Sequence, residues 1–203
     1  MRSGHAVQDM LGTHAHYARR GQSLATAALA GARDFVRWAH HPREDAVDAV
    51  HASRFYYHAH DADEMMAQEH GHFHVFVNAP EAGANGLAHL VGISMDAQGL
   101  PLRLFTTNGW VTGEAWTPAE ALREALLGFR LVQTGRLAPV ARWITAMVQF
   151  YAPVIEDLLR ARDAQLHSHP AGIAQAWQDR AWHITSQQLL TDHWQRLQKE
   201  CEA

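Results

Sequence analysis

The middle of the chain alternates between apolar and polar side chains, which is the pattern of strands with one face on a core. Between residues 70 and 78, one set of alternate positions is small or apolar and the other carries three histidines. The strands predicted in this way span residues 54–60, 70–78, 89–95 and 102–106. Ala97-Gln98-Gly99 marks a tight turn. Because short turns join consecutive strands, we expect an antiparallel sheet of about four strands.

Helical sequence is expected on both sides of this sheet. Residues 24–38 are rich in alanine and leucine, which favour helix. A shorter helix is predicted from Arg43 to Val50, because Pro42 ends the first one and suits the first turn of the next. The first fifty residues are therefore predicted to be helical.

The residues after the sheet carry the signals of further helices. Thr117-Pro118-Ala119-Glu120 predicts a helix start, with Thr117 as the N-cap and Pro118 in the first helical position. A long helix is expected over residues 139–164 with a kink at Pro153, and a last one over residues 172–200 with a break near Thr185. We expect a single α+β domain, helical over residues 1–50, a sheet over 53–107 and helical again over 117–203.

Composition narrows the class of protein. The chain has 203 residues, of which 47% are hydrophobic and 19% charged, enough for the core of one domain. A net charge of -4 argues against electrostatic capture of nucleic acid. We see neither an apolar run long enough for a membrane nor a signal peptide, and Cys201 is the one cysteine, so we expect a cytoplasmic protein.

Histidine is the unusual component, with 16 residues against 17 lysines and arginines together. Five histidines and four carboxylates fall between residues 58 and 74. Side chains two positions apart point to the same face of a strand. If the two strands pair, both sets of imidazoles share one surface, with cross-strand Cβ atoms about 5 Å apart. The candidate metal ligands are His58, His60, His70, His72, His74 and Glu64, with Asp61 and Glu69 as further carboxylates.

The run His70-Gly71-His72-Phe73-His74-Val75-Phe76-Val77 resembles the signature of the histidine triad hydrolases. That resemblance implies an α+β nucleotide hydrolase or transferase in which the middle histidine attacks a phosphate. His72 is then the nucleophile, with His70 and His74 as supporting partners. The run departs from the family at Gly71, where an apolar residue is usual, and it covers about eight residues.

The sequence has two other resemblances, one in the same region and one over the whole chain. The segment from His58 to Asp63 resembles the ligand motif of metallo-β-lactamase-like hydrolases, but Ala62 and Asp63 stand where that motif has aspartate and histidine. Taken whole, the chain resembles an uncharacterised bacterial family of unknown function, and this resemblance implies no activity.

A second candidate patch follows the last predicted strand. Arg103 and Asn108 are suited to bind an anionic substrate, and Trp110 is suited to line a pocket. The alternative interpretation is a turn whose aromatic residues pack beneath the next helix. The seven tryptophans suit a homodimer interface or a helical core equally well.

Three functions remain open from the sequence. The first is a metal-dependent enzyme of the hydrolase or oxygenase type, with a zinc, iron or copper ion, an unidentified small-molecule substrate, and His72 and Glu69 as candidate catalytic residues. The second is a metal-free transfer enzyme that uses His72 covalently. The third is a non-enzymatic module that binds metal or a partner.

Overall fold

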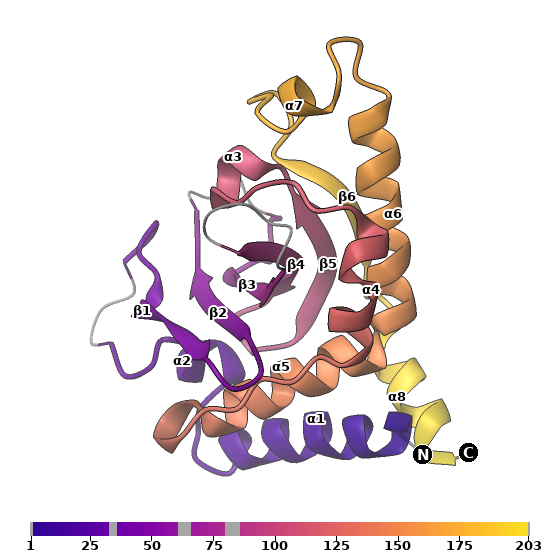
Figure 1. Ribbon diagram of the computed structural model, residues 1–203. Helices are drawn as coiled ribbons and strands as arrows, with labels where there is room; N and C mark the ends of the chain where they lie inside the picture. The colour runs from indigo at the N-terminus through magenta and orange to yellow at the C-terminus, as the bar shows by residue number, and fades with distance from the viewer. Residues whose placement is uncertain (1, 33–35, 61–65, 80–85, 203) are drawn as a thin grey trace.

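One antiparallel sheet organises the structure. The computed structural model describes residues 2–32, 36–60, 66–79 and 86–202. Within them, six strands are hydrogen-bonded in the order of the sequence, each antiparallel to the next, and the sheet is strongly curved (Figure 1). The strands are β1 (His41–Asp48), β2 (Ser53–His58), β3 (Gly71–Asn78), β4 (Leu87–Met95), β5 (Pro101–Thr107) and β6 (Ile184–Leu189).

The helices lie on one face and at one end of this sheet. They are α1 (Arg2–Ala18), α2 (Leu24–Ala28), α3 (Gly109–Thr112), α4 (Ala119–Leu127), the 3-10 turn η2 (Gly135–Leu137), α5 (Ala138–Phe150), α6 (Ala152–His167), α7 (Ile173–Ala176) and α8 (His193–Glu202). Helices α1 and α5 run side by side beneath the sheet, whereas α6 packs against β4, β5 and β6 (Figure 1). No helix in the described part of the chain is long and apolar enough to cross a membrane.

The apolar face of the sheet forms the core with α1 and α5. Phe55 and Phe73 on neighbouring strands are fully buried, and the Phe73 ring packs 5.9 Å from the ring of Trp143 on α5. Val75 continues this face. The opposite face of β2 and β3 is also buried, but it carries histidines. The α1/α5 layer therefore leaves the histidine face to be covered by other elements.

The predicted α+β class, with an antiparallel sheet between N- and C-terminal helices, is confirmed, but two strands were predicted as helix. The segment from Arg43 to Val50 belongs mostly to β1, where buried Ala46 and Asp48 flank exposed Val47. The segment around Thr185 is β6, which pairs with β5. Sheet pairing at the two edges outweighs the local helix preference of these segments.

Three helix boundaries also differ from those predicted. Helix α2 ends at Ala28, because Ala30 and Gly31 both take positive φ and turn the chain away. The remainder of the predicted helix is not helical where it is described, and Phe35 lies outside the described residues. Instead of one helix kinked at Pro153, α5 and α6 are separate helices that meet at Tyr151, with Pro153 in the first turn of α6.

The start of α4 is built differently from the predicted cap. Pro118 holds the N-cap position, and the buried Thr117 hydroxyl has no hydrogen-bond partner in the described structure. The Asp163 carboxylate of α6 accepts a hydrogen bond from the Ala119 backbone N–H instead, at 2.6 Å. A tertiary contact thus replaces the local cap.

Gly71 gives a test of how closely β2 and β3 approach. A Cβ atom at this position would lie 2.6 Å from the His58 carbonyl oxygen and 2.8 Å from the Tyr57 hydroxyl. We expect Gly71→Ala to lower the free energy of unfolding by about 2 kcal/mol or more, through strain between the two strands. Gly12, exposed on α1 with open space around it, is the control, and Gly12→Ala should raise stability by about 1 kcal/mol. Urea denaturation measures both, and equal small effects would contradict the packing described.

Candidate metal centre

The register between β2 and β3 brings histidines together across the sheet. His58 lies directly opposite His72, and Tyr56 lies opposite His74. Because alternate side chains share a face, these four residues lie on one surface, which we call the histidine face. His58, His72 and His74 are 7%, 5% and 1% exposed, so these side chains present little surface to bulk water.

The imidazole nitrogens of this face converge on one point. The Nε2 atom of His58 lies 2.9 Å from Nε2 of His72 and 3.2 Å from Nε2 of both His60 and His74. Ligand atoms of His58, His72 and His74 all lie within 4.8 Å of one another. Tetrahedral zinc, with Zn–N bonds of about 2.0–2.1 Å, needs nitrogens about 3.3 Å apart, so these spacings are close to those of a metal site.

Hydrogen bonding alone does not satisfy this arrangement. A neutral imidazole nitrogen has either one hydrogen or one lone pair. The Nε2 atom of His58 can therefore complete a hydrogen bond with only one of its three nitrogen neighbours. A buried polar atom that lacks a hydrogen bond lowers the stability of the folded state. A cation at the centre of the cluster removes this conflict, since it accepts every lone pair.

Two residues hold the triad from behind. Glu69 lies 2.6 Å, through Oε1, from Nδ1 of His72, and its other oxygen accepts from Arg103 at 3.3 Å. His89 lies 3.0 Å, through Nε2, from Nδ1 of His74. Because an ionised carboxylate only accepts, Nδ1 of His72 carries the proton and Nε2 presents its lone pair to the cluster. This is the orientation that a metal ligand needs.

Burial keeps the other imidazoles neutral. Burial lowers the pKa of His58 to about 2, and the neighbouring His72 adds to the effect. The pKa of His74 is likewise held well below its usual range by burial and by His72 and His89. Burial alone would raise the pKa of Glu69, but the hydrogen bond with His72 and the nearby Arg103 guanidinium leave it lowered. The site therefore combines neutral nitrogen donors with one ionised carboxylate.

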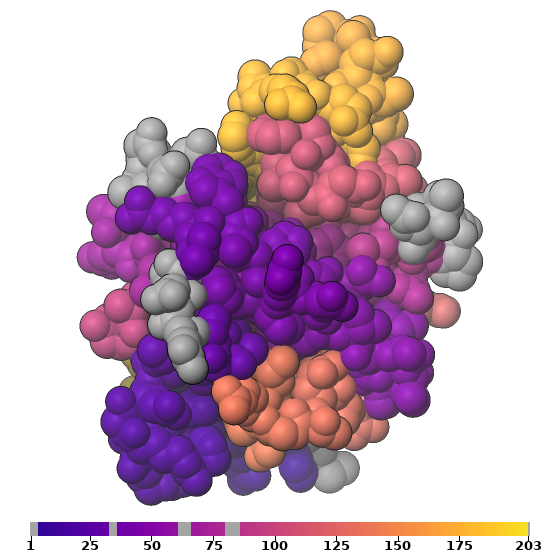
Figure 2. Space-filling model, turned by 90° about the vertical axis from the view of Figure 1, so that its left-hand side faces the viewer, coloured from indigo at the N-terminus to yellow at the C-terminus, as the bar shows by residue number. Residues whose placement is uncertain are grey.

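The cluster adjoins a cavity of about 500 Å³. The residues before β1, those of α3 and those near position 180 come together at its rim, on the face shown in Figure 2, where they are purple, pink and yellow. A smaller hollow of about 40 Å³ lies between His72, His74 and Arg103. The cavity is lined by Trp38, His40, Tyr56, His58, His60, Trp110, Val111, Arg180 and His183. The histidine cluster thus reaches a space of substrate size through His58 and His60.

The structure brings together four of the five predicted histidines. His60 reaches the cluster from the end of β2, is half-buried, and stacks on Trp38 with ring centres 4.3 Å apart. His70 does not join the cluster, because it precedes β3 and its ring turns toward the core face. Its Nδ1 lies 2.8 Å from the hydroxyl of Tyr57, which is a residue of that face. The prediction that His70 shares a surface with His72 and His74 is therefore wrong. Asp61, Asp63 and Glu64 lie outside the described residues.

Of the three residues in the second predicted patch, two lie at the histidine cluster or its cavity and one has a structural role elsewhere. Arg103 is buried beside Glu69 and also donates to Ser94 and Gln187. Trp110 lines the cavity. Asn108 is not among the residues that line the cavity. Its amide oxygen accepts a hydrogen bond from the Gly109 N–H, and its amide nitrogen donates to the carbonyls of Ala176 and Asp179.

Sequence reasoning missed His89 as a member of the cluster. A bulge between Val75 and Phe76 shifts the β3/β4 register, so that His89 lies opposite Phe76 and on the histidine face. Without that shift, the alternation would have placed His89 on the core face. No feature of the sequence signals the bulge.

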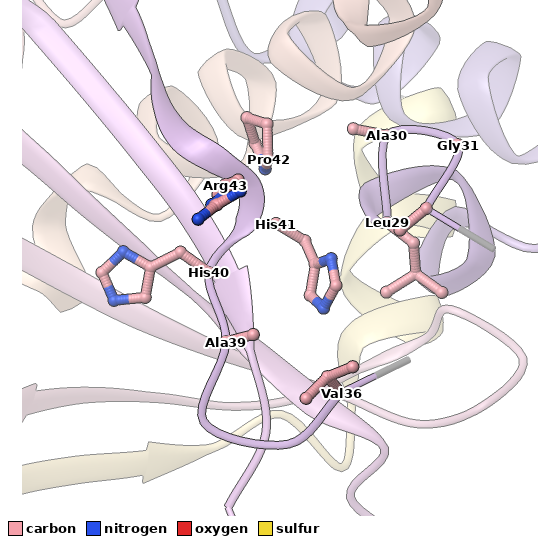
Figure 3. A pocket seen from close by; sticks show the side chains of 10 residues that line it. Leu29, Ala30, Gly31, Val36, Ala39, His40, His41, Pro42 and Arg43 are labelled. Carbon is pink, nitrogen blue, oxygen red and sulfur yellow. The ribbon is translucent and has the colours of Figure 1, made fainter. Parts of the chain in front are cut away.

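His40 was also missed. Its ring stacks on Tyr56, with centres 3.7 Å apart, and contacts His58 edge-on. Figure 3 shows that His40 and His41 project to opposite sides of the backbone, with His41 turned toward a second hollow beside Leu29, the residue that follows α2. The segment just before β1, where the sequence predicted the end of a helix, therefore contributes one wall of the site.

The fold and site define an α+β protein with a buried histidine cluster that can hold a metal ion. A family model described as a domain of unknown function, DUF6969, matches residues 4–190, so the chain belongs to this family. No curated protein matches the chain, and no solved structure does. The resemblance to a family of unknown function is confirmed, and none of these comparisons links the chain with the histidine triad hydrolases.

Glu114 is a buried carboxyl group near His89 that the sequence did not single out. It is 7% exposed. Burial raises the pKa of Glu114 from 4.5 to about 7, and the Thr112 hydroxyl and the Arg162 guanidinium oppose this rise only in part. The folded protein therefore keeps a proton that the unfolded chain releases between these two pH values, so stability falls as pH rises across this window.

This linkage predicts the effect of Glu114→Gln. The difference between the two pKa values corresponds to about 3 kcal/mol. The free energy of unfolding of the variant, relative to the native protein, should therefore rise by about that amount between pH 4 and pH 8. Denaturant unfolding at several pH values measures it, with exposed Glu120→Gln as the matched control that should show no trend. A flat difference for Glu114→Gln would contradict the raised pKa.

Proposed function

We propose that His58, His72 and His74 bind a transition metal ion, and that the protein is a metal-dependent enzyme acting on a small molecule in the adjoining cavity. The observation that carries the proposal is the meeting of imidazole nitrogens around Nε2 of His58 at 2.9 and 3.2 Å. Hydrogen bonds cannot satisfy that arrangement, whereas one cation can.

The partners behind the triad support a metal site. Histidines that bind metal usually donate their other N–H to a carboxylate or another acceptor, which fixes the ring and raises its basicity. Glu69 supplies such a carboxylate to His72, and His89 meets Nδ1 of His74. Because Glu69 lies against Nδ1 of His72, on the side away from the cluster, we assign it an orienting role and not that of a ligand.

The surroundings favour catalysis over a purely structural ion. Structural zinc sites are closed by four protein ligands, whereas catalytic sites keep an open position. Here three buried histidines form one side, and the cavity of about 500 Å³ lies on the other. His60, at the mouth and half-buried, is the group that would give way to substrate.

The donor set limits the choice of ion. Imidazole suits zinc, iron, copper and nickel, and three neutral nitrogens without a thiolate argue against the softest ions. A bound ion of this kind would polarise a substrate oxygen or lower the pKa of a water molecule. The chain's own residues would orient the ligands through Glu69 and hold the substrate in the adjoining cavity.

A second candidate function rests on the Glu69–His72 pair. A carboxylate 2.6 Å from Nδ1 also holds an imidazole as a nucleophile through its Nε2. This metal-free hypothesis does not explain why the neighbouring nitrogens lie so close to His58. It makes the opposite prediction for metal content, so one measurement separates the two.

Metal analysis tests the proposal directly. Untagged protein purified without chelator should contain close to one transition ion per chain by plasma mass spectrometry. His72→Ala/His74→Ala should lose it, because two of the three ligands disappear. His167→Ala/His169→Ala is the matched control, since it removes two histidines with the same spacing outside the cluster. A metal-free protein that takes up no zinc, iron or copper would favour the nucleophilic role of His72.

The role of Glu69 gives a finer test. Glu69→Gln keeps the shape of the side chain but removes the charge that fixes the His72 proton. We expect zinc affinity, measured by competition with a chromophoric chelator, to fall about 10- to 100-fold. Glu156→Gln, which alters an ion-paired carboxylate away from the site, should leave the affinity unchanged. Unaltered affinity in Glu69→Gln would show that Glu69 does not orient the ligand.

A further inference from the structure

The cavity beside the metal centre indicates the chemical class of its ligand. Resting on the proposed function, we propose that the substrate is a small planar molecule with a carboxylate, whose ring lies against Trp110 and whose carboxylate pairs with Arg180. Both residues line the same cavity as His58 and His60. A molecule anchored at Arg180 would therefore extend toward the metal-binding nitrogens.

The charge of the lining selects an anion. The described residues that line the cavity include one arginine, four histidines and no carboxylate. Within the described structure, no ion pair engages Arg180, and its guanidinium lies 5.3 Å from the centre of the Trp110 ring. A guanidinium on an aromatic face keeps its N–H groups at the edge, where they can grip a carboxylate with two parallel hydrogen bonds.

The walls select a flat, apolar body. Trp110 is fixed in place, because its Nε1–H donates to the carbonyls of Asp179 and Trp182 at 2.9 and 3.0 Å. Trp38 and Tyr56 supply two more aromatic rings. The Tyr56 ring is held in place, since it stacks on His40. Rigid rings bind planar ligands with little loss of side-chain freedom.

A single arginine fits a carboxylate better than a phosphate ester. Its two parallel N–H groups match the two oxygens of a carboxylate. Arg180 is the one arginine among the described residues of the lining, which include no lysine. The lining thus matches one planar, delocalised anionic group beside Arg180.

The test uses naphthalene-2-carboxylate as the probe, with its neutral amide and with octanoate as controls. Calorimetry is carried out on the metal-loaded full chain, whose metal content is measured on the same sample. The carboxylate should bind more tightly than the amide by roughly tenfold or more, and octanoate should bind more weakly because it is not planar. Arg180→Gln should reduce carboxylate affinity roughly tenfold without changing amide affinity or metal content.

The control variant is Arg43→Gln, which removes the same charge beside the second hollow. It should bind all three probes as the native chain does. Metal-loaded protein that does not bind the carboxylate, or that binds it equally well as Arg180→Gln, would overturn this inference and leave the metal site standing. Protein that holds no metal would overturn the proposed function and this inference with it.

Discussion

The pairing of β2 with β3 in the register that sets His58 opposite His72 is the constraint on which the rest of the site depends. A slip of one residue would turn every side chain of one strand to the other face. The histidines would then enter the core between the sheet and helices α1 and α5, and Phe73 would turn toward the cavity. Gly71 permits this register beside the end of β2, since a side chain there would meet the His58 carbonyl. One backbone arrangement therefore builds both the apolar core and the polar site.

A buried polar face on a sheet needs a continuous set of partners. Glu69 and Arg103 support His72, and Arg103 is in turn held by Ser94 and Gln187 from two other strands. His89 supports His74 in the same way from β4. These contacts reach from β3 to β6, so the edge strand stabilises the position of a residue in the middle of the sheet. The imidazole nitrogens around Nε2 of His58 are the part of this network that hydrogen bonds cannot satisfy. We place the metal ion there.

The parts of the fold that were predictable are those in which local pattern and tertiary role agree. The alternation in β3 follows directly from Phe73 and Val75 on one side and His72 and His74 on the other. The pattern failed where pairing overrides local signals, as in β1, where Pro42 was interpreted as the first turn of a helix. The site was predictable to the extent that alternation places His58, His60, His72 and His74 on one face. The position of His89 depends on a bulge, and that of His70 depends on where β3 begins. The position of Glu69 depends on the path of the chain before β3. A single sequence records none of these features.

Anomalous diffraction from crystals of the zinc-loaded protein is the most direct measurement of the central claim. The account predicts one strong peak at the zinc edge, about 2.0–2.1 Å from Nε2 of His58, His72 and His74, with Glu69 on Nδ1 of His72 and outside the coordination sphere. A peak bound by other residues, or no peak at the histidine face of fully loaded crystals, would contradict it.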